Sequence, residues 1–145
     1  MKSSAVLSSV VVVVFVLLVP LLASLAPAAY ASNSTTVTIS GQVSTTFTVT
    51  VRAHASGTPS SLSGGGTDSP PPNSSTGNPA VCQFPLGGST DGTTVTLSGT
   101  VTQSSTPSAI GTPVVITADA STGAITFNFG GTILTGTGTV VIRTG

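Results

Sequence analysis

Charged residues are almost absent from this sequence. Asp, Glu, Lys and Arg make up 4% of its 145 residues, Glu does not occur, and the only lysine is Lys2. Binding to nucleic acid depends on Lys and Arg side chains that neutralise phosphates, so we expect no nucleic-acid partner. The formal net charge is zero, which leaves little electrostatic repulsion between copies of the chain and permits self-association.

The residues that carry acid–base and metal chemistry are equally scarce. From residue 32 onward the chain has one histidine, His54, one cysteine, Cys82, and three carboxylates, Asp68, Asp91 and Asp119. A structural zinc site needs four Cys or His ligands. Asp91 and Asp119 stand in sequence patterns that are typical of turns. A Ser–His–Asp triad is defined by geometry, for which the pattern gives no sign. We therefore expect a protein that is not an enzyme and that holds no metal or other cofactor.

The first 31 residues have the features of an export signal. Lys2 precedes an uncharged apolar run at residues 5–26, and Ala29 and Ala31 are the small residues that signal peptidase reads, which predicts cleavage before Ser32. The run is also long enough to span a bilayer. Two alternatives therefore stay open: an uncleaved membrane anchor at residues 5–26, or a retained helix that resembles that of archaeal type IV pilins. All three place the rest of the chain outside the cytoplasm, at the cell surface or beyond it.

From residue 32 onward the pattern is that of short strands. Thr is β-branched and favours strands, and this part of the chain has 26 Thr and 17 Ser. Apolar and polar residues alternate at 33–43 and again at 45–55, as in strands with one face in water. Further strands are expected at residues 93–102, 113–118, 124–129, 132–135 and 139–144, with a short apolar segment at 81–86. The four remaining phenylalanines are expected in the core: Phe47, Phe84, Phe127 and Phe129.

Residues 56–78 interrupt the alternation. They contain a run of three glycines, a run of three prolines and one large aliphatic side chain, Leu62. Such a stretch buries too little apolar surface to offset the entropy lost on ordering. It is predicted to be a flexible Gly/Pro/Ser-rich surface loop.

Seven or eight short strands separated by turn signals predict an all-β domain at residues 32–145, after the N-terminal hydrophobic helix. The spacing is typical of a small β-sandwich. Residues 111–129, with the sequence GTPVVITADASTGAITFNF, resemble the central hairpin of immunoglobulin-like modules in prokaryotic surface proteins. The resemblance implies an immunoglobulin-like sandwich and says little about function.

Two kinds of site follow from short sequence features. Asn33 and Asn73 each begin an Asn-x-Ser/Thr sequence, the acceptor for N-glycosylation in exported proteins. Cys82 has no partner for an internal disulfide, so two readings stay open: a buried thiol, or a disulfide between subunits. No phosphate-binding or metal-binding motif accompanies them.

The strand expected at 33–43 follows directly after the predicted cleavage point. Its alternate residues Val37, Ile39 and Val43 are suited to fill pockets of a neighbouring subunit whose sheet the strand completes. This layout resembles that of archaeal extracellular threads and bundling pili; the alternative is that the strand pairs within its own domain. We expect a non-catalytic extracellular structural protein, a filament, pilus-like or coat subunit whose partners are copies of itself. The alternative functions are a cell-surface binding module or adhesin, or a membrane-anchored surface protein, cellular or viral.

Overall fold

The computed structural model describes residues 33–45, 47–69 and 80–145. The expected N-terminal helix, the cleavage site at Ala29, Ala31 and Ser32, and the glycosylation candidate Asn73 lie outside these residues. Within the described ranges, no helix is long and apolar enough to cross a membrane.

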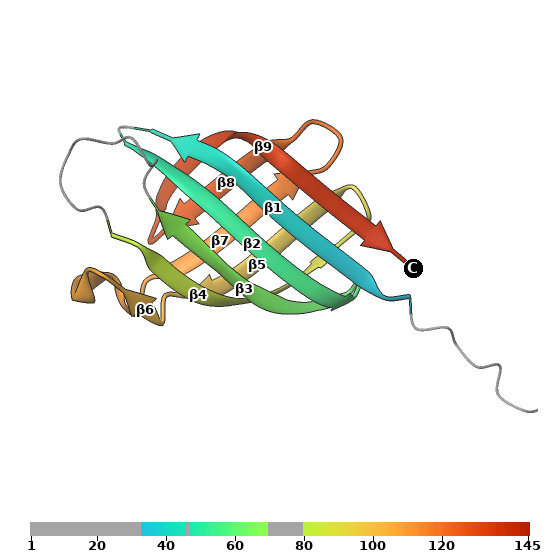
Figure 1. The fold of residues 1–145 in the computed structure, drawn as a ribbon, viewed down its shortest axis with the longest axis horizontal. Coiled ribbons are helices and arrows are strands. Elements are labelled where there is room, and N and C mark those ends of the chain that lie inside the picture. Colours follow the sequence, from blue (N-terminus) through green and yellow to red (C-terminus); the bar gives the residue numbers. More distant parts are fainter. Residues whose placement is uncertain (1–32, 46, 70–79) are drawn as a thin grey trace, which may run out of the picture. The chain divides into compact units, whose positions relative to one another are not determined.

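The described residues form one antiparallel sheet in which each long strand pairs with the next one along the chain (Figure 1). The pairing of β3 with β4 and of β1 with β9 closes this sheet into a ring of eight strands. The short β6 is not one of the eight, because it pairs only with the first two residues of β4. The strands are β1 Thr35–Ser44, β2 Thr48–Thr58, β3 Ser61–Ser69, β4 Cys82–Thr90, β5 Thr94–Thr100, β6 Gln103–Ser104, β7 Pro113–Asp119, β8 Ala124–Phe129 and β9 Thr132–Thr144, with a 3-10 turn, η1, at Pro107–Ala109.

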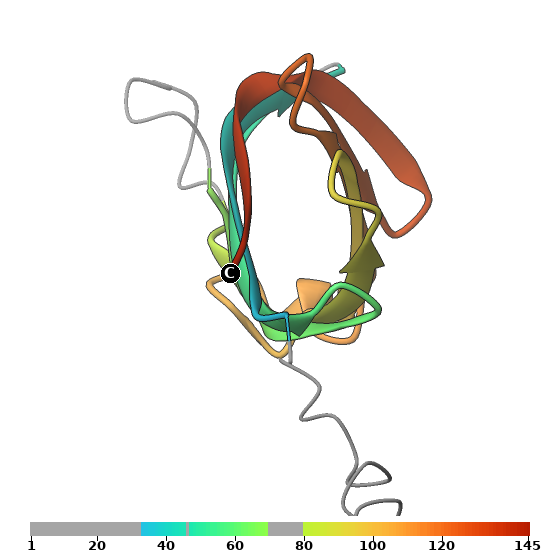
Figure 2. The ribbon, with the colours of Figure 1, turned by 90° about the vertical axis from the view of Figure 1, so that its right-hand side faces the viewer.

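The domain is all-β, as predicted, but the ring corrects the expectation of an immunoglobulin-like sandwich. Figure 2 shows the strands end-on as a closed and flattened ring. A sandwich has two separate sheets with free edges, whereas here β1 and β9 pair over ten residues, from Thr35 with Thr144 to Ser44 with Thr135. The alternation of apolar and polar residues is the same in both architectures, so the pattern alone did not distinguish them.

Glycines make the pairing of β1 with β9 close enough to seal the ring. We call this pairing the seam. Gly41 of β1 lies directly opposite Gly138 of β9, and a Cβ added to Gly41 would lie 2.5 Å from Ile125 Cδ1 and 2.7 Å from the Thr137 oxygen. Glycine is typical of sites where strands bend sharply at a barrel corner. The strand β9 bends here, because it leaves β8 after Thr137 and continues along β1.

Side chains fill the interior of the ring. The rings of Phe84 and Phe127 stack with their centroids 6.1 Å apart, and Phe129 packs against Phe127 at 5.9 Å. A barrel of eight strands is just wide enough for such a filling. The buried apolar residues include Val37, Ile39, Val43, Val51, Leu62, Phe84, Leu86, Val95, Leu97, Val114, Ile116, Ile125, Phe127 and Leu134.

Three local expectations differ from the structure. The strand β3 at Ser61–Ser69 lies within the stretch expected to be a loop, because its main chain is paired on both sides, with β2 and with β4. Residues 132–144 form one strand where two were expected, since Gly136 and Gly138 lie inside the seam. Phe47, expected in the core, is 51% exposed in the connection between β1 and β2.

The two ends of the barrel differ in chemistry. One end, which we call the terminal end, holds Ser34, Gly145 and the connections at residues 59–60, 91–93 and 120–123. The opposite end, which we call the rim, is where β1, β3, β5 and β8 finish and β2, β4, β7 and β9 begin; the described residues of its connections are Thr45, Phe47, Ala80, Val81 and those at 101–112 and 130–131. In Figure 1 the C-terminus marks the terminal end, and the point of the β1 arrow marks the rim.

Candidate functional site

The residues with acid–base or metal-binding chemistry are spread over the barrel. His54 lies on its outer face, Cys82 lies in its interior, and Asp91 and Asp119 lie at the terminal end. Among the described residues, no three His, Cys, Asp or Glu side chains come close enough to hold one metal ion.

Asp91 and Asp119 stabilise turns. Asp91 Oδ1 accepts hydrogen bonds from the amides of Thr93 at 2.8 Å and Thr94 at 2.6 Å. Asp119 Oδ1 accepts one from the amide of Ser121 at 2.7 Å and another from the Ser121 hydroxyl. These bonds favour the ionised carboxylates and lower the pKa of both groups.

A small polar cluster lies inside the barrel near the rim. Asp68 of β3 is opposite Cys82 of β4 and is only 6% exposed. Burial raises the pKa of the Asp68 carboxyl, partly offset by its hydrogen bond with the thiol. Burial also raises the pKa of Cys82, whose Sγ lies 3.3 Å from Ser104 Oγ. Cys82 is 1% exposed, so a disulfide between subunits would require the barrel to open at this point.

The proposed donor strand is paired on both of its sides within the chain. Val37, Ile39 and Val43 are buried inside the barrel, and every residue of β1 has a partner on β2 and another on β9. The glycosylation candidate Asn33 is exposed at the terminal end, directly before the seam. The strand therefore fills a place in its own barrel rather than a free edge.

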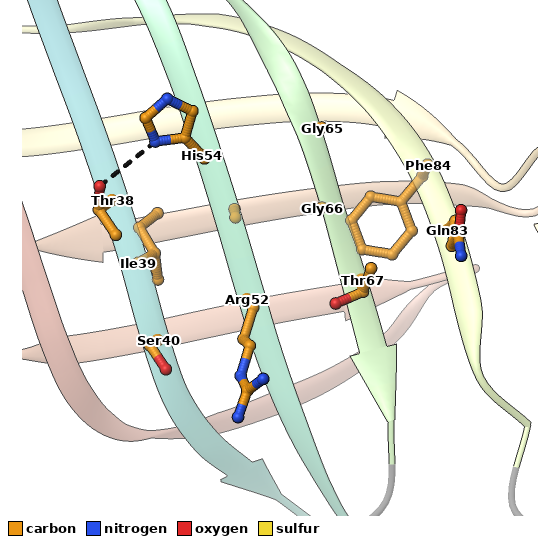
Figure 3. Close-up of a pocket in the computed structure, with 11 residues that line it drawn as sticks. Thr38, Ile39, Ser40, Arg52, His54, Gly65, Gly66, Thr67, Gln83 and Phe84 are labelled. Atoms are coloured by element: carbon orange, nitrogen blue, oxygen red, sulfur yellow. Dashed lines mark hydrogen bonds between the residues drawn. The ribbon is translucent and has the colours of Figure 1, made fainter.

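A groove of about 510 Å³ crosses the outer face of strands β1 to β4 (Figure 3). Its centre is Gly65 of β3, which leaves a gap between the side chains of β2 and those of β4. His54 is hydrogen-bonded to Thr38, with 3.4 Å between Nδ1 and Oγ1. Two rows of paired residues form the groove and its border: Thr38, His54, Gly65 and Pro85 in one, and Ser40, Arg52, Thr67 and Gln83 in the other.

The groove has cationic character. Arg52 is exposed between Ser40 of β1 and Thr67 of β3, and its side chain extends away from Gly65 (Figure 3); no carboxylate lies on the outer face of β1 to β4. Asp68, the one acidic residue of these strands, faces the interior, and Asp91 and Asp119 belong to turns at the terminal end. The hydroxyl and amide groups of Thr38, Ser40, Thr67 and Gln83 lie beside the apolar Ile39, Ala53 and Phe84 in the lining. The sequence pattern had suggested an exposed His54 but gave no sign of this groove, because residues 63–66 were expected to be a loop.

Exposed apolar side chains are confined to the rim. The large apolar residues that the structure exposes are 43% to 57% accessible; three lie in connections of the rim, and the fourth, Ile133, is the second residue of β9, close to the same end. The described residues of these connections carry no charge. The four exposed residues, which we call the rim residues, are Phe47, Val81, Ile110 and Ile133.

Comparison with known proteins found no matching protein-family model, no matching curated protein and no matching solved structure. The groove and the rim residues are the two surface features of the described residues that bear on function.

Proposed function

We propose that this chain is a non-catalytic structural protein that acts outside the cytoplasm and assembles with copies of itself through the rim. The observation that carries the proposal is the position of the rim residues, which all lie at or close to a single end of the barrel. Exposed apolar side chains that gather in one region can form a contact with another molecule. The export-like N-terminal segment is the support for the extracytoplasmic location.

The absence of charge at the rim favours a second copy as the partner. Two rims that face each other bring together uncharged side chains and suffer no electrostatic repulsion, whereas the terminal end carries the ionised Asp91 and Asp119. A contact between like ends is isologous, with the same residues on both sides of a two-fold axis. In the proposed filament, pilus-like or coat assembly, this paired unit is the building block.

The proposed contact uses side chains and not strand donation. Because β1 is paired along its whole length with β2 and β9, donating it to a neighbour would first break both ladders. Association through the rim leaves the barrel intact. It therefore needs no refolding of either copy.

Sedimentation velocity over a wide range of concentrations tests the proposal on the purified chain. We expect concentration-dependent association of the wild-type chain. The variant with Phe47→Thr, Ile110→Thr and Ile133→Thr should bind at least about tenfold more weakly, because each substitution occurs twice in a two-fold contact. Electron microscopy of the exported protein should show paired or polymeric particles.

The matched control replaces an apolar residue of the barrel wall. Val141 is half-buried and pairs with Thr38, away from the rim, so Val141→Thr should leave the association constant unchanged. A wild-type chain that stays monomeric at every concentration refutes the proposal. So does a rim variant that associates as well as the wall variant.

The groove favours a second function, that of a cell-surface binding module. A concave outer surface with an unpaired cation and several hydroxyl groups is suited to hold a ligand while the rim and the terminal end stay free. The two functions are compatible, because the groove and the rim residues lie on different parts of the barrel.

A further inference from the structure

Gly65 is a glycine that the barrel does not need. A Cβ added to its neighbour Gly66 would lie 2.5 Å from Phe84 Cε2, and one added to Gly64 would collide with the His54 carbonyl oxygen. A Cβ added to Gly65 would meet only the Phe84 oxygen, at an ordinary 3.5 Å. Glycine inside a strand destabilises it relative to alanine. Its cost at this position has no return in packing, which is also true of Gly87 outside the groove, and the missing side chain leaves the groove open between His54 and Pro85.

We propose that the groove binds an acidic oligosaccharide, a sugar chain that carries carboxylate or sulfate groups. Arg52 supplies the cation, since its guanidinium matches the geometry of a carboxylate or sulfate with two parallel hydrogen bonds. The exposed Thr38, Ser40 and Gln83 supply donors and acceptors for sugar hydroxyls. The open backbone at Gly65 gives a sugar ring access to the floor of the groove.

The lining argues against the other ligand classes. A peptide that added a strand would need a free sheet edge, and β1 to β4 are each paired on both sides. An acyl chain would need exposed apolar side chains, but Ile39, Ala53 and Phe84 at the groove are buried. Nucleic acid needs several cations along a phosphate backbone, and the groove has one arginine. An acidic sugar needs one cation and several polar neutral groups, which is the set present.

Arg52 also has a matched counterpart outside the groove. Arg143 lies on the outer face of β9, paired in register with Thr36, and borders a neighbouring hollow that shares Thr38 with the groove. The substitutions Arg52→Gln and Arg143→Gln remove the same charge from the same barrel. Gly65 has a counterpart in Gly87 of β4, where an added Cβ would meet only the Leu62 oxygen, at 3.6 Å.

The experiment measures the fluorescence anisotropy of labelled tetragalacturonate mixed with the purified full chain. A sulfated tetrasaccharide from heparin, neutral maltotetraose and free acetate and sulfate serve as competitors. We expect either acidic tetrasaccharide to displace the label, and maltotetraose and the free anions to fail at the same concentration. Arg52→Gln should weaken binding about tenfold, the effect of losing one charge-assisted interaction. Gly65→Leu should abolish it by filling the groove.

The controls separate the groove from general charge effects. Arg143→Gln and Gly87→Leu should both bind within about twofold of the wild-type chain. Equal binding by Arg52→Gln and Arg143→Gln overturns the proposal, as does a Gly65→Leu variant that still binds. Competition by acetate or sulfate equal to that of the acidic sugars overturns the assignment to an oligosaccharide. Loss of self-association in the rim variant leaves these results unchanged, because the groove does not depend on the rim.

Discussion

Two glycine-to-alanine substitutions in the same barrel should change stability in opposite directions. In Gly41→Ala, the new methyl group would lie 2.5 Å from Ile125 Cδ1 and 2.7 Å from the Thr137 oxygen. Ile125 is 1% exposed and is held in the core, and the Thr137 oxygen is main chain. Neither neighbour has room to withdraw. In Gly65→Ala the nearest atom is 3.5 Å away, so the new methyl group fits without any shift.

The magnitudes follow from these contacts. Overpacking a tight site costs about 1–3 kcal/mol, while replacing glycine in a strand gains roughly 0.5–1 kcal/mol. The net free energy of unfolding should fall by about 1–2 kcal/mol in Gly41→Ala and rise by about 0.5–1 kcal/mol in Gly65→Ala. For a domain of this size, 1 kcal/mol corresponds to roughly 4 °C in melting temperature. We therefore expect a decrease of about 4–8 °C and an increase of about 2–4 °C.

Urea denaturation and thermal melting, both followed by circular dichroism, measure these differences. The two substitutions are chemically identical, so a general effect of alanine on strand propensity moves both variants the same way. A shift of the same sign in both would refute the role assigned to the seam and the claim that Gly65 is sterically free.

Three further predictions concern the carboxylates and the thiol. Burial raises the pKa of Asp68, so this group contributes fully to the free energy of unfolding below its unfolded pKa of about 3.9, and the contribution is lost as the pH rises through the folded pKa. Urea titrations of the wild-type chain should therefore show a decline in stability above about pH 4, and Asp68→Asn should remove that decline. Hydrogen bonds lower the pKa of Asp119, so this group stabilises the folded state above its unfolded pKa and the stabilisation is lost in acid. The difference in melting temperature between the wild-type chain and Asp119→Ala should therefore shrink toward about pH 3. A difference that stays constant would contradict the turn geometry. Cys82 is buried, so dithionitrobenzoate should label it only after urea unfolding, and fast stoichiometric labelling of the folded chain would contradict its place in the core.

The sequence predicted those parts of the fold that depend on local pattern. Residues 113–118 are β-branched and apolar, residues 125–129 alternate, and both segments are bounded by Asp119 and Gly123; they form β7 and β8 almost at the expected bounds. The first two strands were likewise found within a few residues, because one face of each is buried. The outward position of His54 followed from the same alternation.

The features that depend on distant contacts were not predictable in this way. Closure of the ring requires β1 to meet β9, about a hundred residues later, and only the glycines at the seam hint at so close an approach. The strand β3 lacks apolar alternation at Gly64–Gly66, so its order comes from the main-chain hydrogen bonds of its two neighbours. The groove exists because this glycine run is part of a strand. The sequence pattern predicted a loop here, so it predicted neither the strand nor the groove.

The barrel begins and finishes at the same end, and this has a mechanical consequence. Ser34 and Gly145 exchange hydrogen bonds of 3.0 and 2.9 Å at the terminal end, where β1 begins and β9 finishes. A force that pulls these two residues apart peels the strands from one end and breaks their bonds in succession, which needs little force. A force that runs from Ser34 to a partner held at the rim pulls along β1 instead and loads both of its ladders at once. The barrel is thus weak when Ser34 and Gly145 are pulled apart and strong when it is loaded along β1 through the proposed rim contact.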